Sequence, residues 1–167
     1  MDPVHFSGKE VLEMAVKIEE NGLKFYNEAG RATNSRELKE LFETLADEEE
    51  SHIETFNELR KLAGDTGNEG FDPYLQEAVD YLRALADTEV FTNSELGAQL
   101  AEKVTGEADA LDYAIDMEKD SLLFYYELQK MIREKDRDVL EQLIEQEKDH
   151  VSKLRSLKKK LIGKAGR

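Results

Sequence analysis

One arrangement of acidic residues and histidines occurs twice along this chain. In each copy, a glutamate in one predicted helix is followed, in the next predicted helix, by the pattern Glu-x-x-His. The first copy consists of Glu19, Glu49 and His52, and the second consists of Glu118, Glu147 and His150. The copies are 98 or 99 residues apart at every position and use two of the three histidines in the chain. Two helix pairs that pack together would gather four carboxylates and two imidazoles, a ligand set for a binuclear metal site in a helix bundle.

Each of these glutamates lies on an apolar helix face, where a charged side chain is not expected. Residues four and seven positions before and after a helical residue share its face. All sixteen such positions around the four glutamates are apolar or aromatic, although only 40% of the chain is hydrophobic. Around Glu50, by contrast, the same positions are Glu43, Ala46, Glu54 and Asn57. A carboxylate in a core is costly unless it is paired or bound to a metal, so the pattern predicts that cations hold the four carboxylates together.

Helical periodicity extends over almost the whole chain, which contains only two prolines. The periodicity predicts four long helices, at residues 8–30, 35–63, 107–132 and 136–161. The connection 64–106 is expected to contain two short helices, near 74–86 and 93–104. Short loops join the long helices into two antiparallel hairpins, and the connection between the hairpins must cross the bundle. The predicted fold is therefore a single all-α domain, residues 1–167, built as an antiparallel four-helix bundle with one long crossover.

Local capping signals define the expected ends of these helices. Three patterns with a polar residue followed by Glu at the third position predict helix starts: Ser7-x-x-Glu10, Asn34-x-x-Glu37 and Thr92-x-x-Glu95. Two glycines, Gly30 and Gly64, are expected to end the first two long helices.

Composition limits the classes of protein to which the chain can belong. The 167 residues suffice for one domain with a sizeable core, and the formal net charge of −15 argues against nucleic acid as the main partner. Residues 153–167 contain seven basic residues and no acid. That run could contact nucleic acid or a membrane, but the solvated end of a helix explains it better, since the helix dipole favours positive charge there.

Cysteine is absent, which excludes disulfides, iron–sulfur clusters and Cys-ligated metal modules. No apolar run approaches the roughly 20 residues needed to cross a membrane. Residues 1–10 also lack the character of a signal peptide. We therefore expect a cytoplasmic protein with no membrane partner.

The Glu-x-x-His spacing suits metal binding because residues three apart on a helix project from one face, about one turn apart. Two such pairs on facing helices, with one Glu from each remaining helix, can surround two cations. Mixed carboxylate and imidazole ligands suit iron or manganese and tolerate zinc. The alternative is a bundle with buried, protonated glutamates that has lost its metal.

At these residues the chain resembles the ferritin-like superfamily and, within it, the rubrerythrin-type di-iron proteins. The resemblance is sharpest at the two Glu-x-x-His patterns, at Glu19 and Glu118, and at the Phe-Tyr pairs that follow them. It implies that Glu49 and Glu147 bridge two iron ions. It also implies terminal ligands for each ion, in the pairs Glu19 with His52 and Glu118 with His150.

The sequence departs from the rubrerythrin pattern in two respects. Rubrerythrins usually append a rubredoxin-like domain with four cysteines, which this chain lacks, so electrons would need an external, rubredoxin-like donor. They also have an extra glutamate one turn from the first ligand of the third long helix. Here the positions on either side of Glu118 are Ile115 and Ser121.

These observations favour a non-haem di-iron oxidoreductase that reacts with hydrogen peroxide or dioxygen. Two alternatives remain at this point: an iron-binding, ferroxidase or storage protein without turnover, and a zinc-filled or vestigial structural bundle. Tyr26 and Tyr125 are expected to contact ligand carboxylates or bound peroxide, or else to be ordinary core tyrosines. A homodimer is expected, because the connection 73–105 contains more apolar side chains than two short helices can bury alone.

Overall fold

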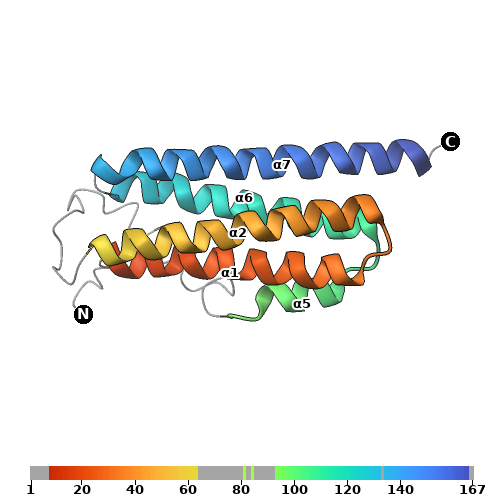
Figure 1. Cartoon of the computed structure of the whole chain (residues 1–167), viewed down its shortest axis with the longest axis horizontal. Helices are drawn as coiled ribbons and strands as arrows, with labels where there is room; N and C mark the ends of the chain where they lie inside the picture. Colours follow the sequence, from red (N-terminus) through yellow and green to blue (C-terminus); the bar gives the residue numbers. More distant parts are fainter. Residues whose placement is uncertain (1–7, 64–80, 82–83, 85–92, 133, 166–167) are drawn as a thin grey trace.

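The computed structural model confirms an all-α bundle of four long helices (Figure 1). It describes residues 8–63, 81, 84, 93–132 and 134–165. The long helices are α1 (Gly8–Ala32), α2 (Arg36–Ala63), α6 (Glu107–Met131) and α7 (Arg137–Ala165). A shorter helix, α5 (Leu96–Lys103), precedes α6, and a 3-10 turn, η1 (Glu134–Asp136), precedes α7. The short helix predicted near 74–86 lies almost entirely outside the described residues.

The order of the helices explains the long connection between the two hairpins. Figure 1 shows α1 and α7 running in one direction and α2 and α6 in the other. Since α2 and α6 are parallel, the chain must return along the whole bundle before α6 begins. Helix α5 belongs to that return segment and lies beside α1. The crossover predicted from the sequence is therefore present, and it leaves an extra helix on the outside of the first hairpin.

Three of the predicted helix signals are wrong in detail. Ser35, not Asn34, caps α2, because its Oγ accepts a hydrogen bond from the backbone N–H of Leu38 at 3.3 Å. Helix α1 continues to Ala32 instead of ending at Gly30. Gly30 is buried inside the helix where α1 meets α2, and a Cβ there would make an ordinary contact of 3.4 Å with Cβ of Phe42, so this glycine is an interior residue of α1 and does not end it.

The third difference concerns the start of α5. Glu95 precedes the helix instead of occupying its first turn. The side chain of Asn93 forms the turn, since its Oδ1 accepts a hydrogen bond from the backbone N–H of Glu95 at 3.0 Å. Asn93 therefore supplies the local signal that the sequence interpretation assigned to the Thr92 pattern.

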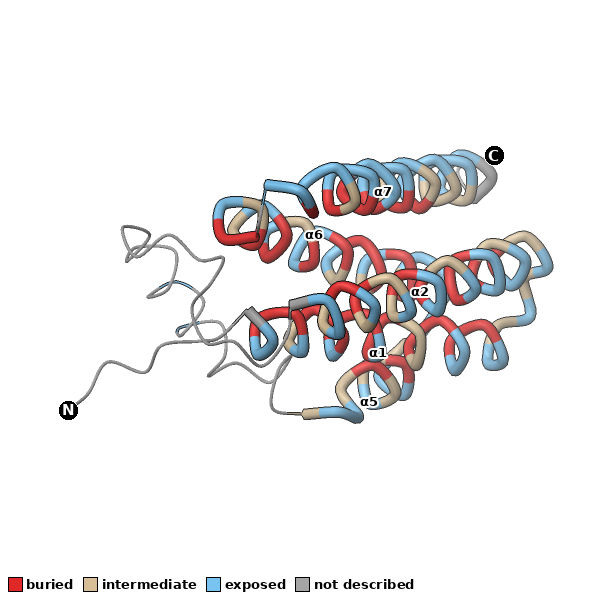
Figure 2. Tube along the Cα trace, turned by 60° about the vertical axis from the view of Figure 1, so that its left-hand side comes forward, coloured by how far each residue is buried: buried red, intermediate tan, exposed pale blue. Residues whose placement is uncertain are grey.

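Burial follows the inward faces of the helices (Figure 2). The buried apolar side chains form two clusters. One cluster includes Phe56, Phe124 and Leu140, and the other includes Phe25, Phe42 and Leu154. The buried charged residues belong to neither cluster. Among the described residues, no helix is both long and apolar enough to cross a membrane.

Candidate metal centre

The structure brings all six predicted ligand residues together inside the bundle. They come from the four long helices: Glu19 from α1, Glu49 and His52 from α2, Glu118 from α6, and Glu147 and His150 from α7. Every one of these side chains is buried, with exposed fractions between 0% and 3%. Helical spacing puts each charged residue on an otherwise apolar inward face, so helix packing forces the charges into one region.

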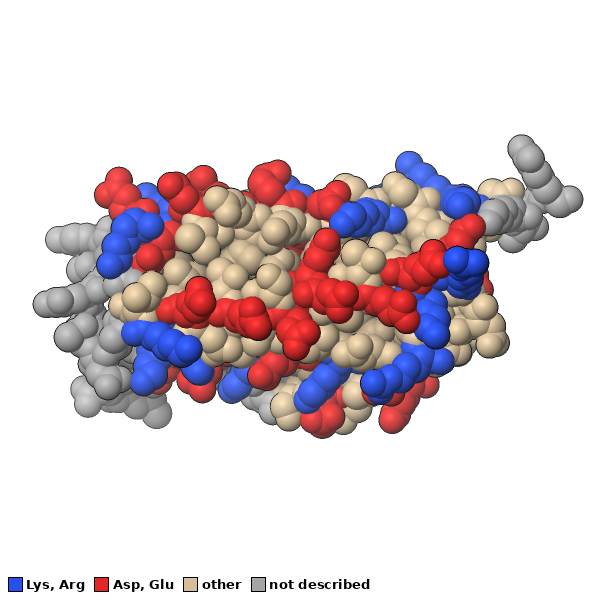
Figure 3. All heavy atoms as spheres, in the orientation of Figure 1, with Lys and Arg blue, Asp and Glu red and all other residues tan. Residues whose placement is uncertain are grey.

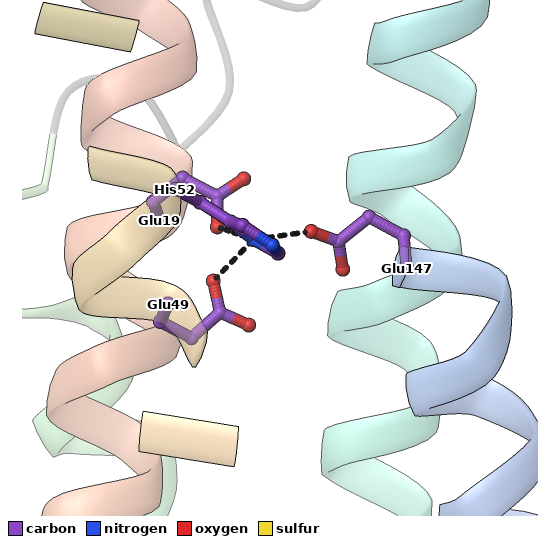
Figure 4. A group of neighbouring side chains, drawn as sticks. All are labelled: Glu19, Glu49, His52 and Glu147. Atoms are coloured by element: carbon purple, nitrogen blue, oxygen red, sulfur yellow. Dashed lines mark hydrogen bonds and ion pairs between the residues drawn. The ribbon is translucent and has the colours of Figure 1, made fainter. Parts of the chain in front are cut away.

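The first group of neighbouring side chains surrounds Nδ1 of His52 (Figure 4). This nitrogen lies 2.8 Å from Glu147 Oε1, 3.3 Å from Glu19 Oε2 and 3.8 Å from Glu49 Oε2. All four residues offer a ligand atom within 4.8 Å of the others. One imidazole nitrogen therefore faces three carboxylates from three different helices.

A second group surrounds Nδ1 of His150 in the same way. This nitrogen lies 3.1 Å from Glu147 Oε2, 3.3 Å from Glu118 Oε1 and 3.6 Å from Glu49 Oε1. The ligand atoms of these four residues also lie within 4.8 Å of one another.

Glu49 and Glu147 belong to both groups. Each places one carboxylate oxygen near His52 and the other oxygen near His150. The two imidazole rings stack with their centroids 5.5 Å apart and their planes inclined by 19°. The arrangement therefore contains two overlapping positions, each with its own histidine and its own terminal glutamate, which share two carboxylates.

Burial and mutual repulsion divide the four carboxyl groups into two kinds. Burial, followed by the charges of Glu49 and Glu147, holds the pKa of Glu19 well above its ordinary value. Burial, followed by the charge of Glu147, raises the pKa of Glu118 to about 8. Burial also acts to raise the pKa values of Glu49 and Glu147, but close contacts with neighbouring carboxyl groups and with the two histidines lower both on balance. In the metal-free protein, the terminal glutamates therefore keep protons and the shared ones are ionised.

In the metal-free protein both histidines are cationic. Burial by itself lowers the pKa of a histidine, but contacts with Glu147, Glu19 and Glu49 raise the pKa of His52 far above its ordinary value. Contacts with Glu118, Glu147 and Glu49 do the same for the pKa of His150. Two imidazolium ions thus balance two ionised carboxylates, which is how the bundle tolerates this cluster without a cation.

The donor atoms of these six side chains suit a pair of metal ions better than they satisfy one another by hydrogen bonding. Both oxygens of Glu147, Oε1 of Glu19 and Nδ1 of His150 are buried without an aligned hydrogen-bond partner. The contact of 2.8 Å between Glu147 and His52 is close but is not aligned as a hydrogen bond. Buried polar atoms rarely stay unpaired. Oxygen and imidazole donors in this number suit iron, manganese or zinc.

Two further residues hold the histidines from outside, and the sequence interpretation missed them. Nε2 of His52 lies 2.9 Å from Oε1 of Gln146, and Nε2 of His150 lies 2.7 Å from Oε2 of Glu48. Each contact crosses from one hairpin to the other. The signal was present in the sequence, because these residues immediately precede Glu147 and Glu49, but only helix packing shows which ring each one reaches.

The two tyrosines expected near the ligands differ in their surroundings. The Tyr26 hydroxyl donates a short hydrogen bond to Oε1 of Glu118, across the hairpins. Burial and the charge of Glu118 raise the pKa of Tyr26 well above its ordinary value, so the hydroxyl stays protonated. The Tyr125 hydroxyl is buried without a hydrogen-bond partner. The structure therefore gives Tyr26, but not Tyr125, a hydrogen bond to a ligand carboxylate.

A cavity of about 500 Å³ extends between α1, α5 and α6 to the ligand cluster. Glu49 and Glu118 form part of its wall, and Leu96 and Leu100 of α5 form another part. Gly22 and Ser121, at equivalent positions of the two hairpins, also line it and leave space beside the carboxylates. The cavity offers a small molecule an apolar route to two of the six ligand residues.

Comparisons with known proteins agree with this geometry. The family model described as Rubrerythrin matches residues 10–158. One similar solved structure is described as a ferritin-like diiron-carboxylate protein from Thermotoga maritima. It is 27% identical in sequence, with a TM-score of 0.65, and the match covers 93% of this chain and 96% of that chain. No curated protein matches the sequence.

Proposed function

The chain belongs to the rubrerythrin family, and on this premise we propose that it is a di-iron oxidoreductase that reduces hydrogen peroxide or dioxygen. One observation supports this most directly: two four-residue ligand groups overlap at Glu49 and Glu147. A single cation would use only one group and would leave the other histidine with its buried carboxylates. Two cations use all six side chains.

In this proposal the two shared carboxylates, Glu49 and Glu147, would help to hold both ions. Glu19 and His52 complete one position, and Glu118 and His150 complete the other. When bound, two ferrous ions together supply the two electrons that, with two protons, reduce one hydrogen peroxide to two waters. Manganese or zinc could occupy the same ligands, but zinc could not supply electrons.

The chain's own residues would bring the oxidant to the cluster and manage a proton there. The cavity beside Glu49 and Glu118 gives the oxidant access between α1 and α6. The Tyr26 hydroxyl donates a hydrogen bond to Glu118, and both residues line that cavity, where the hydroxyl can hydrogen-bond a developing negative charge. The chain has no cysteine, so the electrons would come from a separate, rubredoxin-like protein.

The test is to load the whole chain anaerobically with ferrous iron and then add hydrogen peroxide. We expect about two iron ions per chain and consumption of about one equivalent of peroxide per pair of irons. Consumption should then stop until a reduced rubredoxin is supplied. A zinc-loaded sample is the matched control, since it occupies the site but has no electrons to give.

Other outcomes would select a different function. Iron-loaded protein that leaves peroxide untouched would contradict the oxidoreductase proposal. Continued uptake of iron far beyond two per chain would indicate storage. Protein that binds zinc but rejects ferrous iron would indicate a structural site.

We also propose that the chain pairs as a homodimer and does not bind nucleic acid. Leu123 and Tyr126 lie one helical turn apart on α6 and are 54% and 41% exposed, which leaves apolar surface for a second copy. Of the apolar residues in the connection 73–105 that motivated this expectation, Tyr81 is partly exposed. The others lie outside the described residues: Tyr74, Val79, Leu82, Leu85, Val90 and Phe91. Sedimentation at micromolar concentration tests the dimer, and Leu123→Glu should weaken it.

The surface charge supports the second part of that proposal. Figure 3 shows a band of acidic side chains along the face where α2 lies, and this helix has exposed acids at Glu40, Glu43, Asp47, Glu50 and Glu54. Two of the basic residues near the end of α7 contact acids of the same chain. Lys158 bonds Asp112, and Lys160 bonds Glu37 at 3.1 Å. A DNA-binding assay at low salt should therefore show no binding.

A further inference from the structure

The outer nitrogens of the two histidines contact chemically different side chains. Nε2 of His150 lies 2.7 Å from a carboxylate oxygen of Glu48, and Nε2 of His52 lies 2.9 Å from the amide oxygen of Gln146. These contacts are equivalent by position. Glu48 and Gln146 each precede a shared glutamate by one residue, and each reaches the histidine of the opposite hairpin. The geometry of the site is therefore close to twofold, while its chemistry is not.

A carboxylate imposes one form of the imidazole, whereas an amide permits two. An ionised Glu48 can only accept a hydrogen bond, so when the His150 imidazolium gives up one proton to bind a metal, the proton that remains is held on Nε2. The lone pair of Nδ1 is then directed toward Glu118, Glu147 and Glu49. Gln146 can accept from Nε2 through its oxygen or donate to Nε2 through its NH₂ group. The second arrangement would put the proton of a neutral His52 on Nδ1, where it blocks a metal.

The acceptor also changes how strongly the ring binds a cation. A carboxylate that accepts the outer N–H makes the imidazole a better electron donor to a metal, and removal of such a partner typically lowers metal affinity about 10–100-fold. A neutral amide that accepts the outer N–H increases the electron donation of the imidazole to a smaller extent. Of the two positions, the one that contains His150 should therefore bind a divalent cation more tightly.

Lys153 reduces this difference but does not reverse it. Its Nζ lies 3.4 Å from Oε1 of Glu48, and it also pairs with Asp149 at 2.9 Å. The Glu48 side chain is 39% exposed, so water and Lys153 both screen its charge. The bond to His150 uses the other oxygen, Oε2, which remains a charged acceptor at hydrogen-bond distance.

We propose that Glu48 and Gln146 are positioning residues that make the two metal positions unequal and set the order of filling. The first divalent cation occupies the position of His150 and Glu118, and the second occupies the position of His52 and Glu19. This inference rests on the proposed function only in assuming that the six ligands bind two metals. It concerns affinity and order, not turnover.

The experiment is a titration of the metal-free full chain with Co²⁺, followed by calorimetry and by visible absorption. The wild-type chain should bind in two resolved steps. Glu48→Gln should lower the affinity of the first step about 10–100-fold and merge the two steps. Gln146→Glu should instead strengthen the second step and merge them. Both side chains are at least partly exposed, so neither variant disturbs the core.

The double variant with Glu48→Gln and Gln146→Glu transposes the two partners. It should restore two resolved steps with the order of filling reversed. Proton NMR reads that order, since Co²⁺ strongly shifts the ring N–H signal of the histidine that it binds. With one equivalent of Co²⁺, the shifted signal should belong to His150 in the wild type and to His52 in the double variant.

Asp47→Asn is the matched control, because Asp47 is an exposed acid adjacent to Glu48 in sequence and its loss removes the same charge. It should leave both steps unchanged. Equal effects of Asp47→Asn and Glu48→Gln, or an order of filling that does not reverse, would overturn the inference while leaving the two-metal site intact. Failure of the wild type to bind Co²⁺, Fe²⁺ or Zn²⁺ would overturn the proposed function itself.

Discussion

The two helical hairpins supply matching ligands but hold them in different surroundings. The α1–α2 hairpin contributes Glu19, Glu49 and His52, and the α6–α7 hairpin contributes the equivalent three residues. The tyrosine of the first hairpin, Tyr26, bonds a ligand of the second, while the hydroxyl of Tyr125 has no hydrogen-bond partner. A sequence repeat therefore preserves the ligands, while the groups that contact them have become different in the two halves.

Helix α5 is a second difference, because it packs on the first hairpin. Asn21 of α1 holds it with two hydrogen bonds: Oδ1 accepts from the backbone N–H of Gly97 at 3.1 Å, and Nδ2 donates to the carbonyl oxygen of Asn93 at 3.3 Å. The equivalent residue of the second hairpin is Asp120, and an aspartate carboxylate has no donor for the second bond. One hairpin thus holds an extra helix that forms a wall of the cavity.

The largest expected effect concerns pH. Glu19, Glu118, His52 and His150 all have raised pKa values and keep protons at neutral pH, so each hairpin must release about two protons when its metal binds. The combined binding constant for two metals should then rise by up to about 10,000-fold per pH unit below pH 8. Above a pH of about 8, Glu118 is already ionised, and the contribution of the second hairpin should fall first. Calorimetry in buffers of different ionisation enthalpy measures the released protons.

The same groups determine whether the stability of the metal-free protein rises or falls with pH. The histidines and Glu118 have higher pKa values in the folded protein than in the unfolded chain. Unfolding therefore releases protons, and the metal-free protein should lose stability as pH rises from about 6.5 to 8. A Glu118→Gln control should remove one of the released protons. Metal binding that releases no protons would contradict the assigned protonation states.

The next largest expected effect is on metal content, and it distinguishes the two shared ligands from the two terminal glutamates. Glu49→Gln or Glu147→Gln should lower the metal content from about two to near zero, because each removes a ligand from both positions. Glu19→Gln and Glu118→Gln should each leave about one. At a free metal concentration about 1,000-fold above Kd, bound metal adds roughly 4 kcal/mol of stability. Melting with and without a chelator therefore reports the same distinction, and equal losses in all four variants would contradict it.

Gly97→Ala tests whether the first hairpin depends on α5. A Cβ at this position would lie 1.9 Å from the backbone oxygen of Asn21, and a helix backbone cannot yield to it. We expect α5 to shift and the free energy of unfolding to fall by about 1–3 kcal/mol, measured by urea unfolding. Gly163→Ala is the matched control, since a Cβ there meets nothing within 4 Å. Equal stability of the two variants would show that α5 does not pack on α1 in this way.

The smallest expected effect compares the two tyrosines. Tyr26→Phe removes a buried hydrogen bond to Glu118 and should lower the free energy of unfolding by about 1 kcal/mol. Tyr125→Phe removes a buried hydroxyl that has no partner, so its effect should be near zero or slightly stabilising. Equal losses in the two variants would indicate that Tyr125 also bonds a ligand, as twofold symmetry of the hairpins would require.

Much of the fold and all six candidate ligands could be predicted because both depend on local periodicity. The apolar faces around Glu19, Glu49, Glu118 and Glu147 determine which way each side chain points, whatever the exact packing. The predicted long helices match the observed ones to within a few residues. Errors appear where a neighbouring polar residue could cap equally well, as with Asn34 and Ser35, or where a glycine lies inside a helix, as with Gly30.

The sequence by itself thus determined the helices, their pairing into hairpins and the set of residues that face the centre of the bundle. Only the tertiary structure decided which side chains meet across the hairpins. The contacts of Glu48 with His150, Gln146 with His52 and Tyr26 with Glu118 each join residues more than 90 positions apart. Such contacts depend on the axial offset and rotation of one helix against another. Side-chain packing along the whole interface sets those two quantities, and the period of a single helix does not contain them.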